Sequence, residues 1–246
     1  MNEILKIKHL NKTYNSLLSE THAVSDVSFN VYKGEFISIV GTSGCGKSTV
    51  LNIIAGLDKD YSGLVKFKGN ITTSYMLQDD TLFPWLNVLE NASLGLKIQK
   101  KITKENINYV KNLLIKYGLK DFMYKKVTDL SGGMKQRVAL IRTIATKPDL
   151  VLLDEPFSAL DYQNRLKVSM DVHKILKNEQ ITTIMVTHDL SEALSISSRV
   201  IVISKRPSKI KNIYSLNFDK DLSPLERRNT NIFNEYLNIL WRDIDE

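Results

Sequence analysis

The chain has 246 residues, of which 43% are hydrophobic and 25% are charged. This composition is ordinary for a globular protein and excludes a disordered or fibrous one. No stretch approaches the ~20 consecutive apolar residues of a membrane-spanning helix, and the first residues lack the basic-then-apolar plan of a secretory signal peptide. We therefore expect a cytosolic protein, or one that is bound to a membrane through a partner.

The 34 basic residues outnumber the 27 acidic ones, which gives a net charge of +7. Because the basic residues are dispersed along the chain, we favour a mildly basic, solvated surface over a dedicated nucleic-acid surface. Cys45 is the single cysteine, so the chain cannot form an internal disulfide.

Three stretches in the first part of the chain alternate apolar and polar residues, as half-buried strands do. They are residues 4–10, 24–32 and 64–68, and we expect them to form a small antiparallel sheet. Residues 36–40 differ, because they are a short apolar and mostly β-branched run, which predicts a fully buried strand.

A glycine-rich segment, Gly-Thr-Ser-Gly-Cys-Gly-Lys-Ser-Thr, follows this buried strand directly and leads into a helical pattern over residues 48–55. Glycines let backbone N–H groups approach an anion, and a helix N-terminus adds partial positive charge. In such a loop Lys47 neutralises the β- and γ-phosphates, and the Ser48 hydroxyl can bind Mg²⁺. The sequence therefore predicts a nucleoside triphosphate site whose cradle consists of Gly41, Ser43, Gly44, Cys45, Gly46, Lys47, Ser48 and Thr49.

From residue 88 to about residue 147 the spacing of apolar residues is mostly helical. Strand and helix patterns then alternate, which predicts a parallel sheet with crossover helices. We therefore expect a single α/β domain over residues 1–246, with the helical block of about 88–147 inserted into its core. Apolar residues at helical spacing also predict an amphipathic C-terminal helix at about 223–241 that packs on the core.

Two adjacent carboxylates, Asp154 and Glu155, end the apolar strand predicted at residues 150–153. Neighbouring side chains on an extended strand point to opposite sides, so the two groups can take different roles. One can hold Mg²⁺, and the other can orient and deprotonate an attacking water. A helix-capping aspartate is the alternative, but the preceding phosphate loop favours the magnesium and base interpretation.

A second candidate anion site is Leu-Ser-Gly-Gly-Met-Lys-Gln-Arg at residues 130–137. Ser131 is a good N-cap for the helix that follows, and Gly132 and Gly133 leave its first N–H groups bare. A simple capped helix is the alternative interpretation. The presence of two such sites in one chain raises the hypothesis that the second covers a nucleotide on another copy.

Residues 41–49, 130–137 and 150–161, in this order and spacing, resemble the Walker A, signature and Walker B/D-loop motifs of the ATP-binding cassette (ABC) ATPases. The resemblance implies a P-loop NTPase core with a parallel sheet, a small antiparallel β subdomain and an inserted helical subdomain. It also implies a head-to-tail dimer, in which Ser131 and Gly133 of one copy close over ATP bound at Lys47 of the other.

The resemblance brings further residues into the site. Tyr14 matches the aromatic residue that stacks on adenine, although an early tyrosine alone is more often a core residue. The resemblance implies that Glu155 polarises the attacking water and that His188 and Lys47 assist at the γ-phosphate. It also implies that Asp161 lies in the loop that crosses the dimer interface. It assigns the Mg²⁺ ligands as Ser48, Gln78 and Asp154.

One importer subgroup is indicated by one departure from the common signature and by segments that resemble those of the subgroup, among them residues 186–193. Met134 replaces the usual glutamine of the signature, residues 82–91 resemble the Leu-Leu-Pro-Trp stretch of nitrate, sulfonate, taurine and thiamine-precursor importers, and residues 204–207 agree with them. We expect Trp85 to contact a permease helix; a buried turn with Trp85 in the core is the alternative.

These features together predict the ATPase subunit of an ABC importer, located at the cytoplasmic face of the membrane through its permease and served by an extracytoplasmic binding protein. An exporter or lipoprotein-release ATPase and a soluble, non-transport ABC ATPase are the alternatives. The transported substrate is not encoded in this chain, because the permease and the binding protein select it.

Overall fold

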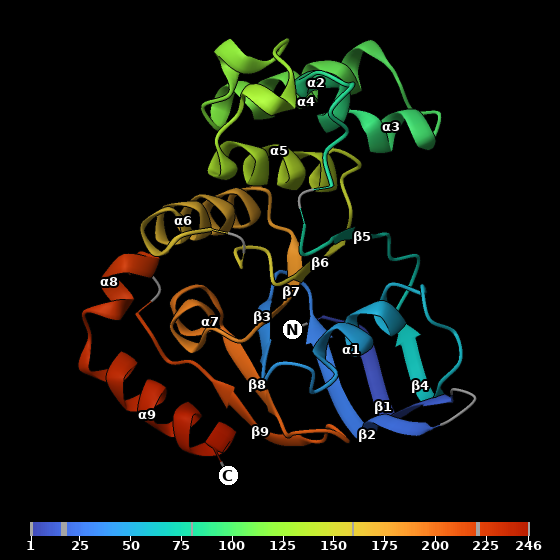
Figure 1. Ribbon diagram of the computed structural model, residues 1–246, viewed down its shortest axis with the longest axis vertical. Coiled ribbons are helices and arrows are strands. Elements are labelled where there is room, and N and C mark those ends of the chain that lie inside the picture. The colour runs from blue at the N-terminus through green and yellow to red at the C-terminus, as the bar shows by residue number, and fades with distance from the viewer. Residues whose placement is uncertain (1, 16–18, 80, 159, 220–221, 246) are drawn as a thin grey trace. The chain divides into compact units, whose positions relative to one another are not determined.

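A computed structural model of the protein describes residues 2–15, 19–79, 81–158, 160–219 and 222–245. The chain folds as two compact units (Figure 1). The first, which we call the terminal unit, combines the residues up to Ile71 with those from Gln180 onward. The second, the central unit, is Thr72–Glu179.

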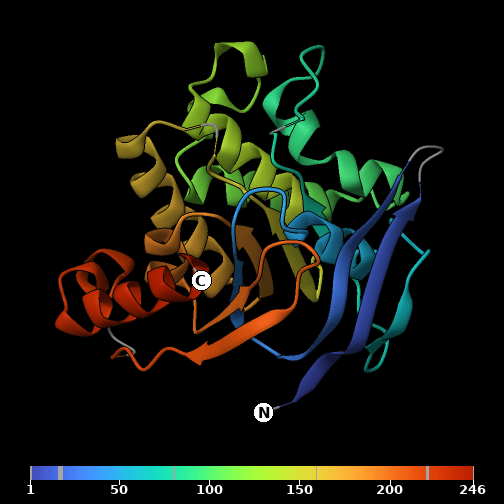
Figure 2. The ribbon, with the colours of Figure 1, turned by 60° about the horizontal axis from the view of Figure 1, so that its bottom comes forward.

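An antiparallel sheet of three strands in the order β2-β1-β4 begins the terminal unit. Its strands are β1 (Glu3–Asn15), β2 (Glu20–Tyr32) and β4 (Ser62–Phe67). Figure 2 shows β1 and β2 side by side as long strands. Both are longer than predicted, because irregularities in their pairing, with left-handed backbone at His9 and Asp26, interrupt the alternation of apolar and polar residues.

Parallel strands form the core of the terminal unit. They are β7 (Thr182–Thr187), β3 (Phe36–Val40) and β8 (Arg199–Ile203), in that order, and β9 (Ile210–Ser215) lies antiparallel to β8. The three parallel strands are almost wholly buried, which explains why they are rich in apolar and β-branched residues. Helix α1 (Lys47–Ile54) follows β3, and α7 (Leu190–Ile196) follows β7.

The C-terminal segment contains two helices where one was predicted. They are α8 (Pro224–Arg228) and α9 (Asn231–Asp245). Ser223 caps α8 together with Glu226, and the Thr230 hydroxyl accepts a hydrogen bond from the Phe233 N–H at 3.2 Å, which starts the next helix in a new direction. Phe233 and Leu240 pack with Leu190, Leu194 and Val202, so α9 lies on the core of its unit, as expected.

In the central unit, the parallel strands β5 (Thr73–Met76) and β6 (Leu150–Asp154) enclose a stretch of helices. The helices are α2 (Val88–Ala92), α3 (Leu94–Ile98), α4 (Lys104–Lys116) and α5 (Gly132–Ile144), with 3-10 turns at Lys120–Phe122 and Val127–Asp129; α6 (Tyr162–Asn178) follows β6. The central unit is therefore wider than the predicted helical block of 88–147, whose boundaries stay a prediction.

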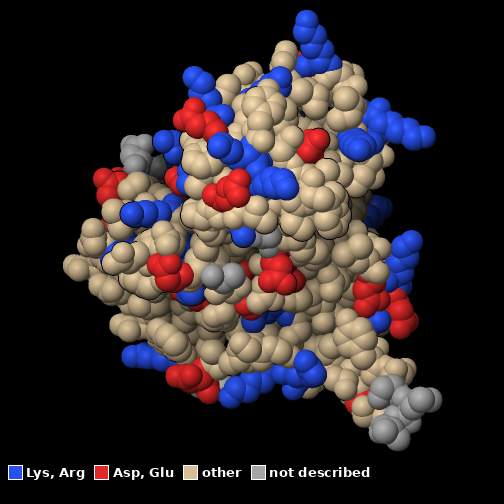
Figure 3. Space-filling model, turned by 45° about the horizontal axis from the view of Figure 1, so that its top comes forward, with Lys and Arg blue, Asp and Glu red and all other residues tan. Residues whose placement is uncertain are grey.

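None of the helices in the described ranges is long and apolar enough to cross a membrane. On the face shown in Figure 3, Lys and Arg side chains are interspersed with Asp and Glu side chains.

Candidate functional site

The glycine-rich loop lies between β3 and α1, as the sequence predicts. Helix α1 begins at Lys47, and its N-cap, Gly46, has a φ of 118°, a conformation that side chains rarely adopt. A Cβ atom on Gly46 would lie 2.9 Å from the carbonyl oxygen of Ala23 and 3.0 Å from the Ser208 hydroxyl. Glycine is therefore required here for both backbone conformation and space, and the loop is packed closely against the neighbouring strand β2.

The Lys47 ammonium is folded over the loop that precedes it. Its Nζ donates hydrogen bonds to the carbonyl oxygens of Gly41 at 2.9 Å and Thr42 at 3.0 Å. The side chain is only 3% exposed. Because phosphate oxygens are stronger acceptors than carbonyls, this ammonium can exchange these partners for a polyphosphate at little cost.

The other loop residues differ in exposure. Ser43 and Ser48 are exposed, whereas the Cys45 side chain is buried. Burial raises the pKa of the Cys45 thiol, and the nearby charges of Lys47 and Arg206 only partly oppose this. The thiol is therefore protonated near neutral pH, which agrees with a packing role for Cys45 and not with a reactive thiolate.

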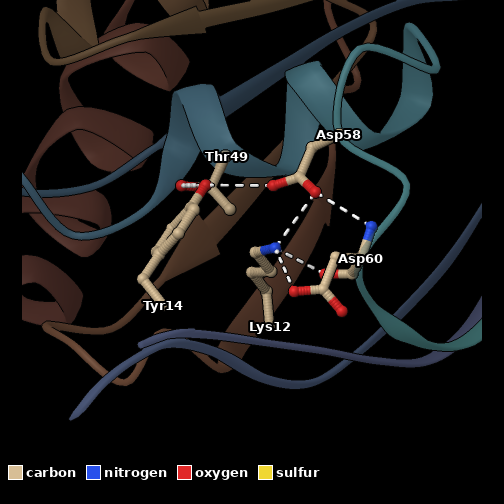
Figure 4. Close-up of polar contacts among 5 residues, drawn as sticks. All are labelled: Lys12, Tyr14, Thr49, Asp58 and Asp60. Carbon is tan, nitrogen blue, oxygen red and sulfur yellow. Dashed lines mark hydrogen bonds and ion pairs between the residues drawn. The ribbon is translucent and has the colours of Figure 1, made fainter. Parts of the chain in front are cut away.

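Tyr14 lies on β1 beside α1, the helix that follows the phosphate loop and that we call the phosphate helix (Figure 4). Its hydroxyl lies 3.3 Å from the Asp58 carboxylate and 3.5 Å from the Thr49 hydroxyl, at the outer limit of a hydrogen bond. The residue is 43% exposed, so it is not the core tyrosine that an early position in the sequence alone would favour. The terminal unit thus brings Tyr14 and the phosphate loop together.

His188 follows the end of β7 and is exposed, while the residues on either side of it are fixed. The Thr187 hydroxyl donates a hydrogen bond of 2.7 Å to the buried Glu192 carboxylate and accepts one of 3.1 Å from the Asp189 N–H. Asp189 caps α7 by accepting a hydrogen bond from the Glu192 N–H. The sequence analysis missed Glu192, because its burial and its hydrogen bond to Thr187 are visible only in the folded structure.

In the central unit, Asp154 ends β6 and is held by a tyrosine that sequence reasoning also missed. The Tyr75 hydroxyl donates a hydrogen bond of 2.8 Å to the Asp154 carboxylate. Burial, followed by the charge of Asp154, raises the pKa of Tyr75 above its ordinary value, so the hydroxyl remains a donor. Tyr75, on β5, lies opposite Leu152 on the paired strand β6, and only the sheet register reveals this neighbourhood.

Glu155 has a left-handed backbone, with a φ of 43°. The two carboxylates are therefore separated by a turn, and not by the pleat of an extended strand as predicted. The Glu155 carbonyl oxygen accepts hydrogen bonds from the Ser158 N–H and hydroxyl, and the Gln78 side chain donates to the same hydroxyl at 3.3 Å. The central unit thus brings Gln78 and the Glu155 turn together. Ala159, in the predicted interface loop, lies outside the described residues.

The signature segment forms the start of α5. Ser131 caps the helix by accepting a hydrogen bond from the Met134 N–H at 3.4 Å. A Cβ atom on Gly133 would lie 2.9 Å from a methyl carbon of Val168, and one on Gly132 would be 3.2 Å from the Leu160 side chain. The two glycines therefore let α5 pack closely against the start of α6.

Asp161 caps α6. Its carboxylate accepts hydrogen bonds from the backbone N–H of Asn164 at 3.1 Å and from the amide of the same residue at 2.6 Å. These bonds hold the pKa of Asp161 below its ordinary value. Asp161 is therefore ionised at neutral pH and oriented by its own helix.

The three residues predicted to bind Mg²⁺ all offer oxygen atoms as ligands. Ser48, Gln78 and Asp154 would supply a hydroxyl, an amide oxygen and one carboxylate, all hard oxygen donors of the kind that Mg²⁺ prefers. Across the described ranges, no group of three or more His, Cys, Asp and Glu residues could hold a metal ion by itself. The chemistry of the donors therefore agrees with Mg²⁺ as the ion, and the assignment of Ser48, Gln78 and Asp154 as its ligands stays a prediction.

Comparisons with known proteins identify the class. A family model described as "ABC transporter" matches residues 24–158. The uncharacterized ABC transporter ATP-binding protein YtlC of Bacillus subtilis is 41% identical, over 98% of this chain and 95% of the relative. The taurine import ATP-binding protein TauB of Pelagibacter ubique is 37% identical, over 97% and 96%. A dimeric structure of the ATP-binding cassette MJ0796, in a post-hydrolysis state bound to ADP and Pi, matches with a TM-score of 0.74 and 30% identity, covering 88% of this chain and 100% of that one.

The chain therefore belongs to the family of ABC transporter ATP-binding proteins. It is an ATPase of this family, with the mixed sheet, small antiparallel sheet and helices of the ABC cassette fold. The resemblance, the fold class and the ATP ligand inferred from the sequence are confirmed. The roles of individual site residues stay predictions.

The fixed surroundings of His188 lead to a test. We expect Thr187→Val to lower the free energy of unfolding by about 2 kcal/mol, because the buried Glu192 side chain loses its hydrogen bond from the Thr187 hydroxyl. Thr183→Val, on the same strand, removes only a bond of 3.3 Å to a neutral carbonyl and should cost about 1 kcal/mol or less. Urea denaturation of both variants measures the difference. Equal losses would show that Glu192 does not brace the end of β7.

Proposed function

We propose that the chain is the ATP-hydrolysing subunit of an ABC importer. Two copies would clamp two ATP–Mg²⁺ between them and move a pair of membrane permease subunits. The observation that carries the proposal is the phosphate loop between β3 and α1, in which the backbone geometry at Gly46 and the position of Lys47 suit a bound polyphosphate. Family membership supplies the transport context.

Nucleotide binding is assigned to the terminal unit's loop and its neighbour on β1. The Tyr14 ring would stack on adenine, and Gly41, Ser43, Gly44, Cys45, Gly46, Lys47 and Thr49 would surround the phosphates. The N–H groups at the start of α1 attract the anion, and Lys47 offsets its charge. The exposed half of Tyr14 supports this assignment, because stacking on a base needs an open ring face.

Hydrolysis is assigned to Glu155 and His188. Glu155 would orient the attacking water and accept its proton, and His188 would contact the γ-phosphate. Mg²⁺, when bound by Ser48, Gln78 and Asp154, neutralises charge on the phosphate oxygens. Tyr75 supports this arrangement because it fixes the Asp154 carboxylate through a 2.8 Å hydrogen bond. Phosphoryl transfer depends mainly on such positioning and charge neutralisation.

A second copy of the chain would complete each ATP site. Ser131, Gly132 and Gly133 at the start of α5 would cover the γ-phosphate held by Lys47 of the other copy, with the Asp161 loop at the interface. The dimeric MJ0796 cassette with ADP and Pi supports this arrangement. Met134 contributes its backbone N–H to the Ser131 cap, so its replacement of glutamine leaves the cap intact.

The permease contact is assigned to the segment after Gln78. Trp85 is 71% exposed and stacks against Phe83 with ring centroids 4.9 Å apart, so the alternative of a core tryptophan is wrong. The buried Asn91 side chain holds the backbone of Phe83 by accepting from its N–H and donating to its carbonyl oxygen. An exposed tryptophan that packs on a partly buried phenylalanine of a fixed turn suits a hydrophobic partner. No observation favours the exporter or the soluble alternative.

We assign the transported solute to the taurine, nitrate, sulfonate and thiamine-precursor class. The TauB relative, a taurine import protein, is similar over nearly its whole length and supports this class. The chain would act at the cytoplasmic face of the membrane, held there by the permease, with an extracytoplasmic binding protein delivering the solute.

The assignment of Glu155 as the catalytic base is tested by the Glu155→Gln variant. We expect this variant to bind ATP with wild-type affinity, while its turnover falls about 100-fold or more, because the water loses its proton acceptor. Phosphate release and ATP titration measure the two quantities. Lys47→Ala should lose ATP binding, and Glu105→Gln on α4 should keep both properties. Near-normal turnover by Glu155→Gln would refute the role of Glu155.

The permease contact is tested by replacing each of the two tryptophans. Tagged chain is purified from detergent-solubilised membranes, and the multi-span membrane protein retained with it is measured. Trp85→Ala should reduce retention about tenfold or more, as loss of a buried aromatic anchor does at interfaces. Trp241→Ala, which removes a 53% exposed tryptophan on α9, should retain the wild-type amount. Undiminished retention by Trp85→Ala would contradict the contact.

A further inference from the structure

A buried ion pair lies against Tyr14, the residue that we propose stacks on the nucleotide base. We propose that Lys12 and Asp58 are positioning residues for the nucleotide base, because they fix the Tyr14 ring as a stacking platform in register with the phosphate helix. The inference rests on the proposed nucleotide site and adds to it two residues that neither hold phosphate nor take part in hydrolysis.

The Lys12 ammonium is the centre of the cluster (Figure 4). Lys12 is 4% exposed, and its Nζ donates to the Asp58 carboxylate at 3.0 Å and to the Asp60 carboxylate at 3.2 Å. It also donates to the Asp60 carbonyl oxygen. Asp58 is partly buried, whereas the Asp60 side chain is 95% exposed. The inner pair is therefore Lys12–Asp58, and Asp60 supports it from the solvent side.

Tyr14 joins the same pair in two ways. The Lys12 Nζ lies over the Tyr14 ring, 4.7 Å from its centroid, within the range of a cation–π contact. The Tyr14 hydroxyl lies 3.3 Å from the other oxygen of the Asp58 carboxylate. Ring face and hydroxyl are thus held by the two members of one ion pair. Lys12 covers one face of a ring that is 43% exposed, so we assign the nucleotide base to the opposite face.

Asp58 also places the ring relative to the phosphate loop. It lies just beyond the end of α1, and the Tyr14 hydroxyl is 3.5 Å from the Thr49 hydroxyl near the start of that helix. The Tyr14 hydroxyl is therefore placed between the first turn of α1 and the segment that follows this helix. A platform fixed in this way binds a base without first losing the rotational freedom of the tyrosine.

The charges in the cluster persist at neutral pH. Burial lowers the pKa of Lys12, but Asp58 and Asp60 raise it by more. Burial raises the pKa of Asp58, but the hydrogen bonds from Lys12 and from the Asp60 N–H outweigh this effect. A buried ion pair contributes little net stability compared with an apolar pair of the same volume. A positioning role explains why charged groups lie here better than stability does.

The test is a double-mutant cycle of Lys12→Met and Tyr14→Ala, read as the dissociation constants of ATP and of inorganic tripolyphosphate. Tyr14→Ala should weaken ATP about tenfold, as the loss of a base–aromatic stack does. Lys12→Met should weaken ATP about fivefold alone and less than about twofold in the Tyr14→Ala background, because coupled residues are not additive. Tripolyphosphate, which has no base, should bind all variants alike. KM for ATP should rise with these losses while kcat at saturating ATP stays unchanged.

Two further variants keep the test decisive. Asp58→Asn should reproduce the effect of Lys12→Met if the latter folds poorly, and Glu105→Gln, which changes an exposed carboxylate on α4, should leave ATP affinity unchanged. Additive losses in the cycle, equal weakening of tripolyphosphate, or no effect of Tyr14→Ala would overturn the inference. Failure of the proposed function looks different: the wild-type chain would bind neither ligand, or Lys47→Ala would bind ATP normally.

Discussion

A polyphosphate needs many donors converging on a small volume, and the chain provides them at one turn of backbone. β3 is buried between β7 and β8, so its end is fixed when the loop begins. The loop closes within a few residues, because α1 starts at Lys47 with a left-handed Gly46 before it. The Lys47 ammonium donates hydrogen bonds to carbonyl oxygens of the same loop.

The surroundings of the loop are as specific as the loop itself. The Ser208 hydroxyl and N–H both donate to the Ala23 carbonyl oxygen, against which Gly46 packs. The Arg206 guanidinium donates to the carbonyl oxygen of Gly44. The N-terminal strand β2 and the segment before β9 therefore support the loop from opposite ends of the sequence. This explains why the terminal unit combines the two ends of the chain.

The residues to which we assign the chemistry on a bound phosphate belong to different units of the chain. The loop, Tyr14 and His188 belong to the terminal unit, whereas Glu155 and the Ser131 cap belong to the central unit. In the central unit a turn separates Glu155, the base that we propose, from Asp154, and Ser131 caps the start of α5. In our account, no single copy uses all of these groups on one nucleotide, and the second copy completes the site.

Local patterns made much of this predictable. The phosphate loop, the buried strands and the Ser131 cap depend on neighbours in sequence, so their residues carry the information. The length of β1 and the break before α9 were missed, since pairing irregularities and a Thr230 cap interrupt otherwise regular patterns. The partners of the site residues were invisible for a different reason. The hydrogen bond from Tyr75 to Asp154 and the one from Lys12 to Asp58 each join segments that are distant in the sequence, so they form only in the folded chain.

The most direct test of the shared site is the mass of the Glu155→Gln chain in solution, measured by sedimentation equilibrium with and without ATP and Mg²⁺. Slow hydrolysis should preserve the closed state, so we predict a mass of 28.1 kDa without nucleotide and twice this mass with it. Adding Ser131→Arg, which places a bulky side chain at the start of α5, should return the mass to that of one chain. A chain that stays monomeric with ATP bound would contradict the account.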